Sequence, residues 1–402
     1  MTQLDRKIFA TLFFALFSTL TGVGIVVPLL PVYAHQLGAG GFAIGLIFGA
    51  FSLSRTLFLP IFGKWSDQRG RKPFIVTGLL AYALISGLFM LADSIESLIA
   101  VRFIQGIASA MIMPVVQAYV GDITPEGSEG LSMGAFNMSV FFGLSVGPVL
   151  GGLIRDGFGL DTAFAAMGMM TLAGCALCAF ILPPTREEQT VLNQRAILPW
   201  RVLLRDPEIG ALFSFRFAYT SSIGVVWSFM PVLASVTFSL SSSATGVLVM
   251  LGVFVSGSLQ APMGWLADRV HRGAMVICGG LIVALSLLLF QWAGHFWHLL
   301  GVIVLFGIGG GLSMPPLMAM AVSKGSRADA MGSVMALLTM AHSLGMLTGS
   351  LLGGWMMDAV DLRHAFSLGA FVMLAGIAGF AFLGKTYLFK APPEQTIPPR
   401  RW

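Results

Sequence analysis

The sequence has few charged residues. Asp, Glu, Lys and Arg make up 10% of its 402 residues, whereas hydrophobic residues make up 56% and the mean hydropathy is +0.87. Soluble globular proteins carry about 25% charged residues, so this composition excludes an ordinary soluble domain. Cysteines are also few, and the three of them say little about the redox compartment. Cys175 and Cys178 are spaced as in some redox and metal sites, but no third or fourth ligand lies nearby, so we interpret them as small apolar fillers and expect no metal and no cofactor.

Apolar runs of about 20 residues, the length that a helix needs to cross a bilayer, recur along the whole chain. The first run follows Arg6 and Lys7; it is too long for the core of a signal peptide, and no cleavage site follows it. We therefore predict an all-α membrane protein with twelve transmembrane helices. The expected helices are residues 8–34, 43–62, 74–92, 98–121, 132–154, 162–182, 209–235, 243–263, 274–293, 297–322, 330–356 and 364–384.

The two halves of the chain resemble each other. The charged segment 63–72, GKWSDQRGRK, recurs in weaker form as 264–273, GWLADRVHRG, which begins 201 residues later (264 − 63). Matches at an offset of 201 or 202 occur in further segments, among them Met113-Pro114 with Met314-Pro315. This near-constant offset predicts a duplication, with the working site between the halves. We expect two pseudo-symmetric six-helix bundles, 1–182 and 209–390, a cytoplasmic linker, 183–208, and a disordered tail, 391–402.

Lysines and arginines are distributed unevenly between the two sides that these helices define. If the N-terminus is cytoplasmic, 18 of the 23 fall on the cytoplasmic side, two (Arg155 and Arg363) on the outer side, and three inside helices. Positively charged loops stay in the cytoplasm, so we predict that both the N- and the C-terminus are cytoplasmic. The net charge of +5 then reflects topology, and because the basic residues form no single patch we expect no nucleic-acid partner.

The charged segment 63–72 contains a candidate gate. Asp67 and Arg71 are four residues apart, so they share one helix face if the flanking helices extend into the segment. Asp122, at the cytoplasmic end of the fourth helix, is the natural outside partner of Arg71, and Gly63 permits another helix to approach closely. Such a charge cluster can hold the cytoplasmic side shut and break when the halves rock. The alternative is a plain topogenic loop, which explains neither the aspartate nor the repeat.

Four segments together resemble the signature motifs of the major facilitator superfamily. They are the charged segment 63–72, residues 101–106 around Arg102, the pattern Gly22-x5-Pro28-x2-Pro31, and the run 143–152 on the fifth helix. Within that run, Gly143, Gly147 and Gly151 form a stripe on which a helix can pack, and Pro148 bends the helix. The Gly-Pro-x-x-Gly-Gly form of residues 147–152 is similar to that of the drug:proton antiporter branch.

This resemblance implies two six-helix bundles, a central cavity lined mainly by the first, fourth, seventh and tenth helices, and rocking alternating access. It implies roles for individual residues as well. Gly63, Asp67, Arg71 and Asp122 would form a cytoplasmic latch, Arg102 would be tied to proton transfer, and Gly147, Pro148 and Gly151 would be the flexible antiporter element. We add Asp268, the second-half copy of Asp67, to the gating residues.

The chain departs from that branch in its embedded charges. We place none of the 18 acidic residues inside a helix, although many exporters of cationic drugs carry an embedded carboxylate. The embedded basic groups are Arg55, Arg102, Arg216 and, midway along the eleventh helix, His342. A buried charge in a membrane is costly and seldom faces lipid, so each points to a cavity or a partner. The candidate substrate-binding residues are Arg55, Gln117, Asn137, Arg216, Tyr219, Trp227, Gln260 and His342.

Each embedded group also has a structural interpretation. Arg55 could bond backbone carbonyls, and Arg102 could snorkel to the outer interface. His342 titrates near neutrality and could carry the proton that a carboxylate carries elsewhere, or it could be a satisfied hydrogen-bonding residue between helices.

Three classes of function compete: a secondary active transporter, a membrane-embedded enzyme and a channel. An enzyme needs a nucleophile, a base and an acid clustered at depth, and the missing carboxylates oppose it. A channel needs a charge ring or a filter sequence, and neither is visible. We therefore predict a transporter and no enzyme: a monomeric, multi-pass protein of the plasma membrane (the bacterial inner membrane) that exports small amphipathic molecules in exchange for protons. The alternative is export of an organic anion or metabolite by means of the embedded arginines.

Overall fold

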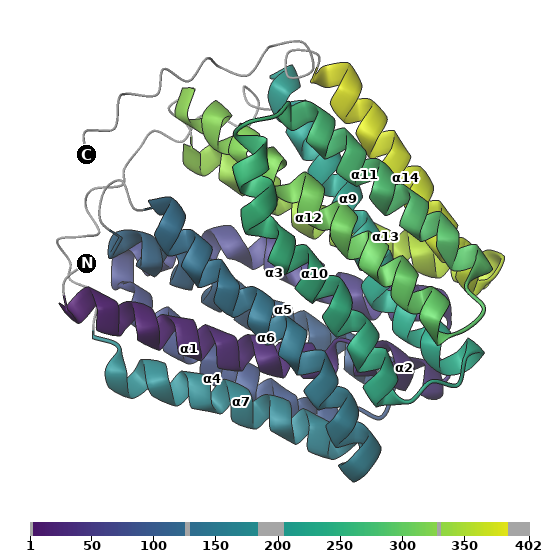
Figure 1. The fold of residues 1–402 in the computed structure, drawn as a ribbon. Coiled ribbons are helices and arrows are strands. Elements are labelled where there is room, and N and C mark those ends of the chain that lie inside the picture. The colour runs from purple at the N-terminus through teal and green to yellow at the C-terminus, as the bar shows by residue number, and fades with distance from the viewer. Residues whose placement is uncertain (1–2, 125–128, 184–204, 328–330, 385–402) are drawn as a thin grey trace.

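A computed structural model describes residues 3–124, 129–183, 205–327 and 331–384, which form an all-helical membrane protein (Figure 1). Twelve helical spans in these ranges are long and apolar enough to cross a membrane, as predicted. Most of the predicted linker 183–208 and all of the predicted tail 391–402 lie outside the described residues. The first half contains α1 (Gln3–Val26), α2 (Leu29–Gln36), α3 (Gly41–Arg69), α4 (Arg71–Met90), α5 (Ile95–Asp122), α6 (Glu129–Phe158) and α7 (Leu160–Ile181). The second half contains α9 (Pro207–Val232), η3 (Leu233–Thr237), α10 (Ser242–Ala267), α11 (Arg272–Leu289), η4 (Phe290–Trp292), α12 (Phe296–Arg327), α13 (Met331–Ala359) and α14 (Leu362–Leu383).

Two predicted helices are broken near their ends, at related points of the two halves. The predicted helix 8–34 is α1 followed by α2, because Pro28 lacks an N–H group and interrupts the ladder of hydrogen bonds after Val26. In the second half, Pro231 lies close to the end of α9, and the chain continues through the π-helical turn η3. α9 begins at Pro207, so the predicted linker extends slightly too far toward the second half.

The charged segment 63–72 is helical almost throughout rather than a loop. α3 continues to Arg69 and α4 begins at Arg71, so Gly70 alone separates them. Gly70 has a φ of +86°, which glycine adopts without steric cost and other residues avoid. The flanking helices thus do extend into the segment, but the expectation that Asp67 and Arg71 share one helix face is wrong, because they lie on different helices.

The packing of the helices repeats from one half to the other. In the first half α1 packs on α6 and α7, α3 on α5, and α4 on α5 and α7. In the second half the corresponding pairs are α9 on α13 and α14, α10 on α12, and α11 on α12 and α14. The span that contains α9 is the most enclosed, with 83% of its most apolar window buried, and the spans of α1–α2 and of α12 follow at 61% each. Three of the four helices expected around the central cavity are therefore the three most enclosed.

Two crossings, α3 on α13 and α6 on α10, join the halves. We call the end of the bundle where α3 begins and α6 and α13 end the opposite end, and the end where α1 begins the terminal end. The halves converge at the opposite end (Figure 1). Glycine makes this contact possible: a Cβ atom at Gly152 of α6 would lie 2.6 Å from Ser243 Cα of α10, and one at Gly354 of α13 would lie 2.9 Å from Phe42 Cα of α3.

We predict that Gly152→Leu separates α6 from α10 at the opposite end, because the added side chain collides with backbone atoms. Overpacking of this kind costs about 1–3 kcal/mol, so the equilibrium shifts toward separated halves by roughly five- to a hundredfold. Spin labels on α6 and α10, in a background without Cys175, Cys178 and Cys278, would report the distance.

The matched control for this variant is Gly157→Leu on the same helix, because nothing lies within 4 Å of a Cβ atom placed there. A Gly152→Leu distance distribution identical to that of the control would contradict the prediction.

Candidate functional site

Carboxylates reinforce both crossings at the opposite end. Asp358, near the end of α13, accepts hydrogen bonds from the backbone N–H groups of Gly41 (2.6 Å) and Phe42 (2.8 Å) at the start of α3. Asp156, near the end of α6, accepts from the N–H groups of Ser242 (3.1 Å) and Ser243 (2.8 Å) at the start of α10, and from the Ser243 hydroxyl (2.5 Å). Each aspartate thus satisfies the free N–H groups of a helix in the other half, where the helix dipole also favours negative charge.

No role for Asp156 and Asp358 was predicted from the sequence, although the sequence contains a signal for them. Asp358 follows Asp156 by 202 residues (358 − 156), the same offset that relates the glycines of the two crossings. Carboxylates repeated at the duplication offset beside a packing glycine are a pattern that can be searched for.

At the terminal end, charged groups connect three helices of the first half. Arg71 of α4 pairs with Asp67 of α3, and its Nε donates to Asp122 Oδ2 of α5 at 3.1 Å, which confirms the predicted contact. Its Nη1 also donates to the Ser66 hydroxyl at 2.9 Å. We call Ser66, Asp67, Arg71 and Asp122 the latch cluster. No atom from another described helix lies within 4 Å of a Cβ placed on Gly63, so among the described residues the close approach of a helix that this glycine permits does not occur in the observed conformation.

The second half keeps only part of this cluster. Arg272 Nη2 donates to Asp268 Oδ1 at 3.0 Å, in the positions equivalent to Arg71 and Asp67, and both side chains are more exposed than Arg71. The residue 202 positions after Asp122 is Lys324, a charge of the opposite sign. Lys324 instead binds Asp206 (2.6 Å) and Glu208 (2.8 Å) at the start of α9. At the terminal end, the helices of the first half are therefore connected by one set of interactions and those of the second half by a different set.

The glycine stripe of α6 packs within the first half. Cβ atoms placed on Gly147 and Gly151 would lie 2.7 Å from Gly24 Cα and Ile25 Cα of α1. Pro148 lies between this contact and the other half, because a Cβ on Gly246 of α10 would lie 2.8 Å from the Pro148 carbonyl carbon. The run thus touches both α1 and the second half, a position suited to transmitting relative motion.

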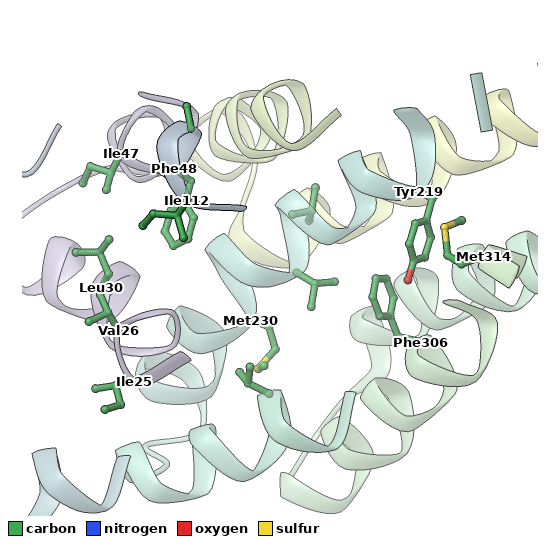
Figure 2. Close-up of a cluster of buried hydrophobic side chains, with 14 of the residues drawn as sticks. Ile25, Val26, Leu30, Ile47, Phe48, Ile112, Tyr219, Met230, Phe306 and Met314 are labelled. Atoms are coloured by element: carbon green, nitrogen blue, oxygen red, sulfur yellow. The ribbon is translucent and has the colours of Figure 1, made fainter. Parts of the chain in front are cut away.

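A pocket lies between the halves, nearer the second. α6 contributes Phe141 and Leu144 from the first half, and α9, α10 and α12 of the second half provide the rest of the wall. Tyr219, Phe306 and Met314 group together in this region (Figure 2), and the rings of Tyr219 and Phe306 stack with centroids 6.3 Å apart. The full lining is Phe141, Leu144, Tyr219, Ile223, Val226, Trp227, Met230, Val249, Gly252, Val253, Ser256, Ile303, Phe306 and Gly307. Sequence analysis identified only Tyr219 and Trp227 among these, because apolar lining residues resemble ordinary packing residues.

Two of the predicted polar residues meet beside this pocket. Arg216, one helical turn before Tyr219 on α9, directs Nη2 toward His342 Nδ1 of α13 at 3.3 Å. Its Nη1 contacts the Met314 sulfur at 2.9 Å, and its Nε is buried without a partner. Because a guanidinium only donates hydrogen bonds, His342 Nδ1 is the acceptor in this contact.

Arg55 and Arg102, both in the first half, differ in how their guanidinium groups are bonded. Arg102 Nη1 donates to Gln105 Oε1 at 2.6 Å, its Nε donates to the Ile47 carbonyl at 3.3 Å, and its guanidinium lies over the Phe51 ring at 4.4 Å. It is held by protein groups and does not snorkel. Arg55, by contrast, has no hydrogen bond or ion pair to any residue that the structure describes, and its buried Nε is unpartnered. The interpretation of Arg55 as bonded to backbone carbonyls is therefore wrong.

Three predicted polar residues do not join the site. The side chains of Gln117 and Asn137 are exposed, and that of Gln260 is half-buried. None of the three lines the pocket. They were predicted as binding residues only from their residue type and their depth in the membrane, and neither property indicates which way a side chain points.

Comparison with known proteins agrees with this architecture. The chain is 29% identical over 381 residues to the inner membrane transport protein YajR of Escherichia coli (strain K12), covering 92% of this chain and 81% of the relative. It is 26% identical over 383 residues to multidrug resistance protein 1 of Bacillus subtilis (strain 168), covering 94% and 95%. The crystal structure of a bacterial homolog of the human lysosomal transporter Spinster, inward-facing and occupied, matches with a TM-score of 0.76 at 15% identity, covering 96% and 97%.

The signature of the Major Facilitator Superfamily matches residues 12–223 and 212–401, which together span nearly the whole chain. The chain is an integral multi-pass membrane protein and a transporter rather than an enzyme. It belongs to the Major Facilitator Superfamily.

Proposed function

We propose that this chain is a secondary active transporter that exports small amphipathic molecules by alternating access, in exchange for protons. The observation that carries the proposal is the pocket between the halves. Its wall combines apolar and aromatic side chains from both halves with the polar side chains of Tyr219 and Ser256. Sites for small organic molecules have this composition, and a site between two rocking halves can face either side of a membrane in turn. The multidrug relative supports the same substrate class.

The observed conformation corresponds to one state of that cycle. The carboxylate-capped crossings close the opposite end, whereas the latch cluster at the terminal end connects helices within one half. The distribution of lysine and arginine predicts a cytoplasmic terminal end, and with that orientation we propose that the conformation is inward-facing. To close the terminal end, a second-half helix would approach the vacant surface of Gly63.

Arg102 is our proposed link to protons. Its bond to the Ile47 carbonyl joins α5 to α3, and α3 is the helix that crosses to the second half. A change of hydration or charge around Arg102 would therefore act directly on one of the two crossings. His342 remains a second candidate for proton coupling, although its contact with Arg216 gives it a role in substrate binding as well.

We expect purified protein in liposomes to accumulate a naphthalene-based organic ion when a pH gradient is imposed, with 2-naphthalenesulfonate and trimethyl(2-naphthyl)ammonium as the permanently charged probes. Arg102→Gln should lower gradient-driven accumulation about tenfold or more and retain exchange of labelled for unlabelled probe, because binding and rocking survive while coupling is lost.

Arg327→Gln, which removes an exposed charge in weak contact with Glu208 (3.6 Å), is the control and should behave as wild type. Exchange without any response to the gradient in wild type would refute proton coupling. Absence of both activities would refute transport of this substrate class.

We predict that Asp67→Asn lowers transport about tenfold or more without lowering the amount of folded protein. Arg71 keeps Asp122 and Ser66 as partners, so α4 and α5 stay connected, but α3 loses its ion pair. Transport of labelled probe and the yield of monodisperse protein are the two measurements. Lys64→Gln, an exposed change in the same segment, is the control, and wild-type turnover in Asp67→Asn would remove the cluster from gating.

We predict that the double variant Asp156→Asn, Asp358→Asn opens the opposite end. Asparagine keeps one acceptor oxygen but loses the negative charge that the helix N-terminus favours, which costs about 0.3–1 kcal/mol per residue, so the two changes shift the equilibrium by roughly three- to thirtyfold. A cysteine introduced at Leu144 in the pocket should then react faster with an impermeant maleimide added on the side of the opposite end.

The control is Asp361→Asn, because Asp361 also lies at that end but caps its own helix through the His364 N–H group (2.9 Å). Equal labelling in the double variant and this control would show that the caps do not hold the end closed.

A further inference from the structure

Two buried arginines, one from each half, have no counter-ion among the described residues. Arg216 of α9 and Arg55 of α3 each have a buried Nε without a partner in the described part of the chain. Arg216 contacts His342 of α13 directly. Gly41, Gly45 and Gly49 of α3 pack in turn against Gly354, Ser350 and Leu347 of α13, so the same antiparallel register, continued toward the terminal end, brings Arg55 level with His342. The group therefore spans three helices and both halves of the molecule.

The groups that surround Arg216 do not neutralise it. Its two bonded neighbours are a thioether sulfur and an imidazole nitrogen, neither of which carries negative charge while it accepts a hydrogen bond. The carboxylates that form ion pairs or caps in the described spans, among them Asp122, Asp156 and Asp358, lie at helix ends. An unpaired charge removed from water costs several kcal/mol, so an anion that enters here recovers a large free energy.

Arg102 provides an internal comparison. It is embedded like the other two, yet its guanidinium is bonded to a side-chain oxygen and a carbonyl oxygen and is covered by the rings of Phe48 and Phe51. An embedded arginine can thus be satisfied by groups of this protein. Arg216 and Arg55 retain unused donors, which is the arrangement of a site that awaits a ligand.

The apolar pocket begins one helical turn from Arg216. Tyr219 follows Arg216 by three residues on α9 and lines the pocket together with Ser256 of α10. Phe306, stacked on Tyr219, and Trp227 extend the apolar wall away from the charged groups. A molecule with an acidic group at one end and an aromatic or aliphatic body would contact both regions at once.

We propose that the substrate is an amphipathic organic anion whose acidic group binds between Arg216 and Arg55 and whose apolar body fills the pocket lined by Tyr219, Trp227 and Phe306. His342 supports this site by orienting the Arg216 guanidinium. The inference rests on the proposed function for the direction of transport, while the binding site itself is tested without transport.

Binding is measured by calorimetry on detergent-solubilised full-length protein with three probes that share one body: 2-naphthalenesulfonate, trimethyl(2-naphthyl)ammonium and the uncharged methyl 2-naphthyl sulfone. Wild type should bind the sulfonate about tenfold or more tightly than the ammonium, as expected for charge-assisted bonds to arginine. Arg216→Gln and Arg55→Gln should each weaken sulfonate binding about tenfold or more and leave sulfone binding within about twofold. The sulfone thus reports that each variant is folded, and Arg327→Gln is the charge-matched control.

Equal affinity of wild type for the sulfonate and the ammonium would overturn the inference, and so would unchanged sulfonate binding in both arginine variants. The result of the binding experiment can be distinguished from the result of the transport assay. Tight, arginine-dependent sulfonate binding without movement of either ion in liposomes would support the anion site and refute the proposed export. Gradient-driven export of the ammonium alone would support export and overturn the anion site.

Discussion

Helices in a membrane gain little from the hydrophobic effect when they associate, because lipid tails are as apolar as leucine. The contact between the halves therefore depends on close backbone approach at Gly41, Gly152 and Gly354, and on two aspartates that satisfy helix N-termini across the interface. Both devices act over a short distance. They hold the opposite end firmly when the helices touch and contribute nothing once the helices separate by a few ångströms, which is the behaviour required of a two-state element.

The small number of charged residues also determines how charge is arranged inside the molecule. A chain with 10% charged residues places its described salt bridges at the helix ends, away from the apolar middle of the spans. Arg55 and Arg216 are buried charges that form no ion pair with the described residues, and Arg216 lies one helical turn from Tyr219 in the pocket wall. In a low-dielectric cavity such charges select the sign of a ligand more strongly than its shape, while the apolar wall tolerates variation in shape.

Duplication accounts for the architecture, and departures from it mark where the halves specialise. Helix packing, both crossings and both capping aspartates follow the repeat. The latch cluster does not, because Lys324 occupies the position equivalent to Asp122 and binds the start of α9 instead. The pocket is asymmetric as well, since the second half supplies most of its wall.

The sequence by itself determined the number of helices, the division into halves and the contact between Arg71 and Asp122, because apolar run length, a constant offset and helix-end charge are one-dimensional signals. Only the tertiary structure decided that Gln117 and Asn137 are exposed and do not line the pocket, that Arg102 is satisfied whereas Arg55 is not, and that Asp156 and Asp358 cap helices of the other half. These outcomes depend on how each helix is rotated about its axis and on which helix crosses it. Rotation and crossing are set by the packing of whole surfaces, and no single residue or spacing encodes them.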